Sequence, residues 1–170
     1  MQATDEYMDI YGINRSPTGR VLKRGEPLGE GEYILVSCCW IVNGEGRFLI
    51  MRRSPKKKSY PGLWEAPGGC ALKGEDSLTA ALREAEEETG IVLDPGGGVC
   101  FASHLFGAAI IDHWLFRHEF DVSKVRLLEG ENTDARSASW SEIAGMIKKG
   151  KFFGENDEVQ EYLKGMTKSS

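Results

Sequence analysis

The chain has 170 residues, of which 41% are hydrophobic and 28% are charged, and its formal net charge is −5. This length and composition suit one globular domain with a sizeable core, and the negative charge argues against broad electrostatic binding to nucleic acid or anionic membrane. The acidic start does not resemble a signal peptide, and the longest apolar run, ILVSCCWIV, is too short to span a bilayer. We therefore expect a cytoplasmic protein.

The first part of the chain is rich in turn residues. Residues 1–30 predict an N-terminal extension around a short hairpin, followed by one domain over residues 31–170. Tyr33–Val42 is β-branched and aromatic, which predicts a buried strand. Asn43-Gly44 is a hairpin turn signal, so Arg47–Met51 is the expected partner strand.

The middle of the chain predicts a loop and one long helix. Residues 52–59 form a basic loop, and residues 61–69 form a short extended piece that ends in a tight glycine turn. The helix runs from about Leu78 to Thr89, with Asp76 or Ser77 as its cap and Gly90 just past its end.

The second half predicts more strands than helices. We expect strands at 99–106, 108–120 and 137–140, an acidic loop at 125–134, and helices at 141–149, capped by Ser141, and at 156–166. A main helix between pairs of strands favours an α+β or layered α/β/α domain. The four cysteines, which lack Cys-x-x-Cys spacing, predict reduced thiols and no zinc site.

The predicted long helix carries an unusual concentration of acid near its C-terminal end. At 100° per residue, Glu84, Glu87 and Glu88 share one arc, whereas Glu86 points away from it. Like-charge pairs at this spacing cost about 0.2–0.5 kcal/mol each, and the helix dipole adds about 0.3–1 kcal/mol. A fold tolerates costs of this size, so these energies do not exclude a solvated acidic face, which is what a glutamate-rich helix face taken alone most often is. Its apolar stripe comprises Leu78, Ala81, Leu82 and Ala85.

The spacing around this helix resembles the Nudix box, over what we call the box segment, Gly69–Ile91. The matching positions are Gly69, Glu75, Arg83, Glu84, Glu87, Glu88 and Gly90. The preceding stretch FLIMRRSPKKKSYPGLWEAPGG also resembles the lead-in of that family, and the resemblance extends from Tyr33 to the last helix. It implies an α+β Nudix fold, a layered α/β/α sandwich with a mixed sheet.

The resemblance to Nudix hydrolases implies a Mg²⁺ or Mn²⁺ cofactor, since hard divalent cations take oxygen ligands. The implied metal ligands are the Gly68 carbonyl, Glu84, Glu87 and Glu88. Glu84 is a ligand or the base that activates water, Arg83 orients Glu84, and Glu75 supports the site. The implied reaction is attack of water on a diphosphate linkage, without a covalent intermediate.

Residues outside the box segment are further candidates. In the family a loop before the final strand often supplies another carboxylate, which points here to Glu131 or Asp134. Arg52 and Arg53 end a strand beside the expected site, and an arginine suits phosphate geometry. For each of these four residues, a solvated surface position is the competing interpretation.

The expected substrate is a small nucleotide-derived diphosphate, such as a nucleoside triphosphate, a nucleotide sugar or ADP-ribose. We expect neither nucleic acid nor membrane as a partner, and the N-terminal extension could support a homodimer. The N-terminal part also resembles isopentenyl-diphosphate isomerase, which needs a catalytic cysteine and metal-binding histidines. Cys70 lies near that region, but no histidine accompanies it and Ile34 stands where relatives often carry one. Isomerase and a non-catalytic ligand sensor are the alternatives.

Overall fold

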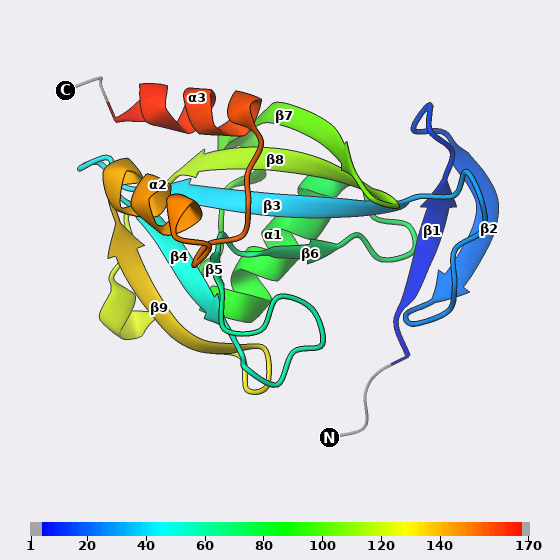
Figure 1. Cartoon of the computed structure of the whole chain (residues 1–170), viewed down its shortest axis with the longest axis horizontal. Coiled ribbons are helices and arrows are strands. Elements are labelled where there is room, and N and C mark those ends of the chain that lie inside the picture. The colour runs from blue at the N-terminus through cyan, green and yellow to red at the C-terminus, as the bar shows by residue number, and fades with distance from the viewer. Residues whose placement is uncertain (1–4, 168–170) are drawn as a thin grey trace.

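The computed structural model describes residues 5–167 (Figure 1). Its main sheet contains β3 (Ile34–Val42), β4 (Phe48–Arg53), β5 (Trp64–Glu65), β6 (Gly68–Cys70), β7 (Gly98–Phe106), β8 (Ala109–Arg117) and β9 (Asn132–Ala138). The strand order is β5-β4-β3-β8-β7, with β6 paired to β3 and β9 paired to β4. β3 and β8 are parallel, whereas the other pairs are antiparallel, so the sheet is mixed.

Helices cover both faces of this sheet. They are α1 (Ser77–Thr89), α2 (Trp140–Lys148) and α3 (Asp157–Met166), with short 3₁₀ turns at Pro95–Gly97 and Val122–Lys124. Figure 1 shows α1 behind the sheet and α2 in front of it. The alternation along β3 explains the layers, because Trp40 packs with residues of α2 and α3 while Ile41 packs with residues of α1. The predicted layered α+β fold is confirmed.

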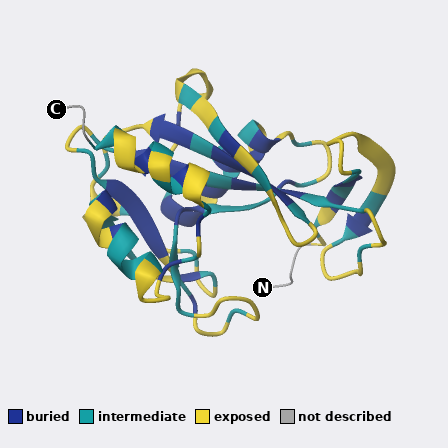
Figure 2. Cartoon of the chain, turned by 45° about the horizontal axis from the view of Figure 1, so that its top comes forward, coloured by how far each residue is buried: buried dark blue, intermediate teal, exposed yellow. Residues whose placement is uncertain are grey.

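Burial follows the same layers. Figure 2 shows buried residues along the central strands and an exposed outer strand at the N-terminal end of the chain. Within residues 5–167, no helix is both long enough and apolar enough to cross a membrane. All four cysteines are free thiols, as expected from their spacing.

The N-terminal extension forms the expected hairpin, β1 (Tyr7–Tyr11) and β2 (Pro17–Lys23). It touches the loop that precedes α1: the Lys73 N–H donates to the Tyr7 carbonyl at 2.8 Å, and the Gly74 N–H donates to Asp9 Oδ2 at 2.7 Å. The hairpin therefore braces the loop that carries Glu75.

The long helix matches its sequence signals. The Asp76 side chain accepts a hydrogen bond from the Thr79 N–H at 2.7 Å, so Asp76 is the cap and the helix begins at Ser77. Gly90 ends it in the left-handed conformation, with φ of 77°, and its N–H donates to the Glu86 carbonyl at 2.8 Å.

Three boundaries in the second half were predicted wrongly. β8 ends at Arg117, three residues before the expected end at 120. β9 begins at Asn132, inside the expected acidic loop, because pairing with β4 holds this polar segment extended. Ser139, and not Ser141, caps α2: its Oγ accepts from the Glu142 N–H at 3.2 Å, and Glu142 Oε2 accepts from the Ser139 N–H at 2.7 Å.

Candidate functional site

The glycine pair before the long helix does not form the tight turn that we predicted. Gly68 and Gly69 lie in strand β6, opposite Cys38 and Ser37 of β3. Glycine is required there by close approach. A Cβ on Gly68 would lie 2.2 Å from the Ser37 carbonyl oxygen, and one on Gly69 would lie 2.3 Å from Glu84 Oε1. The carboxyl of Glu84 therefore rests directly on the backbone of β6.

Two glutamates of α1 are buried against this strand. Glu84 is 9% exposed and Glu88 is 6% exposed. The Gly68 N–H donates to Glu88 Oε2 at 3.1 Å. Burial raises the pKa of Glu84, and Glu87 adds to that effect; burial, Glu84 and Glu65 raise the pKa of Glu88 well above its usual range. Two carboxyls at this depth favour a cation beside them.

Arg83 links the acids of the box segment. Its Nε donates to Glu75 Oε1 at 2.7 Å, and its Nη1 donates to Glu84 Oε1 at 2.9 Å and to Glu87 Oε2 at 3.2 Å. Although burial opposes it, Glu75 and Glu84 raise the pKa of the Arg83 guanidinium. Arg83 therefore fixes the position of Glu84 Oε1, and the orienting role implied by the resemblance stays a prediction.

Glu75 joins the loop before α1 to the same network. Its Oε2 accepts from the Leu72 N–H at 2.8 Å and from Arg83 Nη2 at 3.0 Å. Burial alone would raise the pKa of Glu75, but the hydrogen bonds from Arg83 and Leu72 lower it. This geometry suits the supporting role expected of Glu75.

The remaining two glutamates of the helix are exposed. Glu87 is half exposed and reaches the cluster through Arg83. Glu86 forms no hydrogen bond or ion pair with side chains of residues 5–167, which agrees with the predicted helical arc. The arc therefore divides into two buried members, Glu84 and Glu88, and one member at the rim, Glu87.

The box segment offers oxygen donors of the kind that Mg²⁺ and Mn²⁺ prefer. Across the described residues, no three histidine, cysteine, aspartate or glutamate side chains already surround a single point as metal ligands. The donor chemistry nevertheless fits a hard cation. Glu84 and Glu88 are buried carboxyls, they lie beside the peptide backbone of Gly68 and Gly69, and a Cβ would fill the space between backbone and carboxylate.

A cavity of about 350 Å³ adjoins the same strand. Gly68, Gly69 and Cys70 line it, together with Arg53, Glu65 and Glu155. The rest of its lining is mainly apolar and includes Ile34, Val36, Ile111, Tyr60, Phe106 and Phe153. A ligand in this cavity would lie next to the box segment.

The two candidate arginines lie on opposite sides of β4, because successive side chains of a strand alternate. Arg53 lines the cavity, and its Nη1 donates to Glu65 Oε1 at 2.9 Å and to Oε2 at 3.1 Å. Arg52 Nε donates to the Gly62 carbonyl at 3.2 Å, in a hollow that it shares with Trp64 and Arg136. The structure brings Arg53 to the cavity and leaves Arg52 outside it.

The two candidate loop acids also separate. Glu131 forms an ion pair with Lys57. Burial lowers the pKa of Lys57, while the charges of Glu88 and Glu65 partly offset that effect, so this ion pair lies within electrostatic range of the buried acids. Asp134 is exposed in β9 opposite Arg52. Neither acid lines the cavity.

Two acids of the cavity were not predicted from the sequence. Glu65 precedes the glycine pair, and its position in an apolar extended segment is a signal that points to it. Glu155 lies between α2 and α3, where no local pattern marks it. Burial and the neighbouring Glu65 raise the pKa of Glu155 to about 8.

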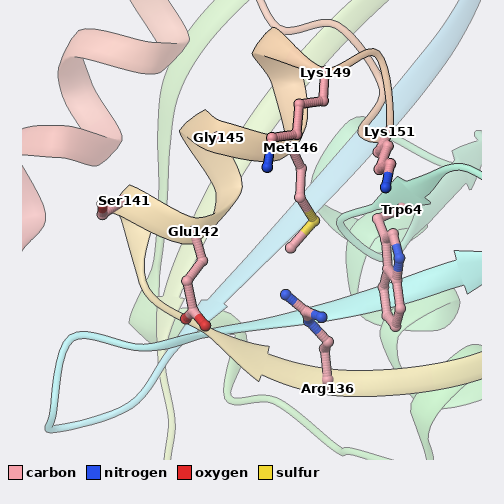
Figure 3. A pocket seen from close by; sticks show the side chains of 8 residues that line it. All are labelled: Trp64, Arg136, Ser141, Glu142, Gly145, Met146, Lys149 and Lys151. Atoms are coloured by element: carbon pink, nitrogen blue, oxygen red, sulfur yellow. The ribbon is translucent and has the colours of Figure 1, made fainter.

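A second hollow, shown in Figure 3, lies between β9 and α2. It has a volume of about 540 Å³ and carries the cationic side chains Arg136, Lys149 and Lys151. The Arg136 guanidinium lies 5.1 Å from the centre of the Trp64 ring. No glutamate of the box segment lines this hollow, so we do not place the reaction there.

Comparison with known proteins agrees with this geometry. A family model described as NUDIX domain matches residues 33–159. An uncharacterized Nudix hydrolase of Listeria monocytogenes is 36% identical over 148 residues, which cover 86% of this chain and 88% of that protein. An isopentenyl-diphosphate Delta-isomerase of Citrobacter koseri is 29% identical over 89 residues, 52% of this chain and 49% of that protein. A Deinococcus radiodurans crystal structure has a TM-score of 0.74 at 19% identity, covering 95% of this chain and 99% of that chain.

Proposed function

Because the chain belongs to the Nudix hydrolase family, we propose that it hydrolyses a diphosphate linkage in a nucleotide-derived small molecule with Mg²⁺ or Mn²⁺ as cofactor. The observation that carries this proposal is the pair of buried carboxyls, Glu84 and Glu88, against the glycine backbone of β6. Such a pair is costly without a cation and well suited to one.

The proposed metal ligands all lie in one short region of the chain, from β6 to the end of α1. Glu87, Glu88 and the Gly68 carbonyl would hold the cation, and Glu84 would be either a further ligand or the base that activates water. When bound, a divalent cation would neutralise charge on the phosphoryl oxygens and make water more acidic. The strand pairing of β6 keeps the Gly68 backbone in place, and Arg83 ties Glu84 to Glu87.

In the proposed reaction, water forms a new bond to phosphorus and the bridging P–O bond breaks, which gives two phosphorylated products. Arg83 Nη1 donates to Glu84 Oε1, so Glu84 Oε2 is the oxygen that would either hold the cation or accept the proton from the attacking water. Arg53 lines the adjoining cavity and is our candidate for contact with substrate phosphate. Glu131, which forms an ion pair with Lys57, and the exposed Asp134 stay the two candidates for an additional carboxylate.

A metal-dependent hydrolysis screen tests the proposal. Nucleoside triphosphates, nucleotide sugars, ADP-ribose and isopentenyl diphosphate are each incubated with Mg²⁺, with Mn²⁺ or with a chelator, and the products are identified. We expect two phosphorylated products from at least one nucleotide-derived substrate, and no cleavage with chelator. Cleavage that is insensitive to chelator, or no cleavage of any substrate, would overturn the proposal.

Location and assembly stay predictions. A small nucleotide-derived substrate suits a protein that acts in the cytoplasm. A homodimer that uses the N-terminal hairpin stays a prediction, and size-exclusion chromatography of the full chain tests it.

A further inference from the structure

The hollow between β9 and α2 adjoins the smaller hollow that contains Arg52. Trp64, Arg136 and Lys151 line both of them, so the two form one surface, which we call the basic hollow. Its cationic side chains come from three parts of the fold, namely β4 (Arg52), β9 (Arg136) and the turn after α2 (Lys149 and Lys151). In a chain with a net charge of −5, a concave surface that gathers four cations is a candidate site for an anion.

No carboxylate within residues 5–167 forms an ion pair with any of these four cations. Among the described residues that line the basic hollow, Glu142 is the one acid, and it is already paired with Arg47 at 3.0 Å. Asp134 lies opposite Arg52 in the pairing of β4 with β9, but it lines neither part of the hollow, and its Oδ1 accepts from the Ala135 N–H at 2.8 Å. The basic hollow therefore carries positive charge that the described part of the chain leaves uncompensated.

The two arginines of the basic hollow lie side by side with free hydrogen-bond donors. Arg52 and Arg136 are diagonal neighbours on one face of the paired strands β4 and β9. The Arg136 guanidinium rests 5.1 Å from the centre of the Trp64 ring, which holds it in place, and it donates no hydrogen bond to any residue in 5–167. Arg52 uses only its Nε, for the Gly62 carbonyl at 3.2 Å. Two neighbouring guanidinium ions repel each other, and a phosphate between them would remove that repulsion and accept their donors.

The backbone holds the two lysines beside the arginines. The Trp64 N–H donates to the Lys151 carbonyl at 2.9 Å, and the Phe153 N–H donates to the Trp64 carbonyl at 2.8 Å, so the segment after α2 is fixed against β5. Gly150, with φ of 64°, makes the turn between Lys149 and Lys151. Figure 3 shows Lys151 beside the Trp64 ring and Lys149 at the end of α2. A lysine ammonium is a compact charge on a flexible stem, so both can reach an anion whose position the arginines define.

We propose that the basic hollow binds the phosphate or diphosphate group of a small molecule, at a site separate from the box segment. The inference goes beyond the proposed reaction and does not depend on it. None of the described residues lines both the basic hollow and the cavity beside β6: Trp64 lines the hollow, whereas the next residue, Glu65, lines the cavity. The four cations gather around one ring, Trp64, which suits a compact anion better than the spaced, singly charged carboxylates of an acidic peptide. A diphosphate carries more charge than one phosphate and can engage more of the four cations.

Calorimetry of the full chain with inorganic diphosphate tests the site. A chelator is present throughout, so that a metal ion neither supports cleavage nor bridges the anion to the box segment. Tetraglutamate at the same ionic strength represents an acidic peptide. We expect diphosphate to bind at least about 10-fold more tightly than tetraglutamate, because arginine pairs with phosphate through two parallel hydrogen bonds and high charge. No binding of diphosphate, or equal or tighter binding of the peptide, would overturn the proposal.

Variants locate the bound anion. Arg136→Gln and Lys151→Gln should each weaken diphosphate binding by about 10-fold, the size expected for a hydrogen bond to a charged group. Lys148→Gln is the matched control: it removes the same charge from the last turn of α2, but Lys148 does not line the hollow, so affinity should stay within about twofold. If Lys148→Gln weakens binding as much as Lys151→Gln, the attraction comes from overall charge and the proposed site is wrong. Wild-type affinity in both Arg136→Gln and Lys151→Gln would place the diphosphate elsewhere.

The Lys151 side chain is exposed, so Lys151→Gln keeps the test decisive if Arg136→Gln disturbs the packing against Trp64. Thermal melts of each variant verify folding. This site and the proposed reaction fail separately. A chain that hydrolyses diphosphate linkages but binds no diphosphate through Lys151 refutes the basic hollow, whereas one that binds diphosphate there and hydrolyses nothing refutes the proposed reaction.

Discussion

Two groups of buried carboxyls lie on the two sides of strand β6, and they have different surroundings. On one side, Glu84 and Glu88 of α1 lie together, with the Arg83 guanidinium and the Gly68 N–H beside them. On the other side, Glu155 faces a mainly apolar cavity without a hydrogen bond from any described residue. Burial raises the pKa in both places.

The comparison shows that burial alone does not decide what a carboxyl does. A buried glutamate that lies next to a second acid and can be reached from solvent is suited to bind a cation. One ion offsets both the cost of desolvating the carboxylates and the repulsion between them. Beside the neutral imidazole of His113 and aromatic rings, a buried glutamate is suited to remain protonated and to act as a hydrogen-bond donor. The following experiments test this division.

The largest expected effect is on turnover when a proposed metal ligand of α1 is changed. Glu88→Gln keeps the size of the side chain but removes a proposed ligand, so turnover should fall by at least about 100-fold. Steady-state kinetics at limiting Mg²⁺ measures this, with a thermal melt to verify folding. Glu86→Gln is the matched control from the same helix and should stay within about twofold of wild type. Near-wild-type turnover of Glu88→Gln would contradict the ligand assignment.

The effect of metal on thermal stability distinguishes a proposed ligand, Glu84, from the solvent-facing Glu86, and it needs no substrate. A cation that binds only the folded chain stabilises it by about 2.7 kcal/mol at a hundredfold excess over Kd. Mg²⁺ or Mn²⁺ should therefore raise the Tm by about 5–10 °C in the wild type. Glu86→Gln should keep this response and Glu84→Gln should weaken it. Identical responses of the two variants would mean that the acidic stretch is a solvated surface.

The raised pKa of Glu155 in the cavity predicts that the free energy of unfolding depends on pH. The folded chain holds a proton on Glu155 up to its pKa of about 8, whereas the unfolded chain releases that proton near pH 4.5. The contribution of Glu155 to the free energy of unfolding is therefore largest below pH 4.5 and declines as the pH rises to 8. Denaturant unfolding at pH 5 and pH 8.5 should show a decline about 4 kcal/mol smaller in Glu155→Gln than in wild type, since each pKa unit is worth about 1.4 kcal/mol. If stability depends on pH in the same way in both proteins, Glu155 is not neutral in the folded chain and its assignment as a protonated carboxyl is wrong.

The smallest expected effect is at Cys70, which lies on β6 between the two groups. Burial raises the pKa of its thiol, so it stays protonated and is a poor nucleophile. Cys70→Ser should change diphosphate hydrolysis by less than about twofold. If the chain instead isomerises isopentenyl diphosphate, and Cys70→Ser stops that reaction, the enzyme is an isomerase and the division proposed above does not hold.

Much of the metal side was predictable from local sequence. The spacing of the box segment identified its residues, and the 3.6-residue period separated Glu86 from the buried pair. The capping residue Asp76 and the terminal Gly90 were also readable, because a helix end is determined by a few adjacent residues. The ion pairs of Arg83 with Glu75, Glu84 and Glu87 occur within one short stretch, where chain connectivity already limits the distances.

Only the tertiary structure decided the cavity side. The β6 pairing with β3 turned an expected glycine turn into an extended strand, and the direction of β4 directed Arg53, and not Arg52, into the cavity. Glu155 reaches the cavity from the segment between α2 and α3, some 90 residues after Glu65, with no motif to mark it. The physical reason is that capping and helical periodicity act between near neighbours, whereas the protonation of a buried carboxyl depends on every charge and dipole that the fold places around it.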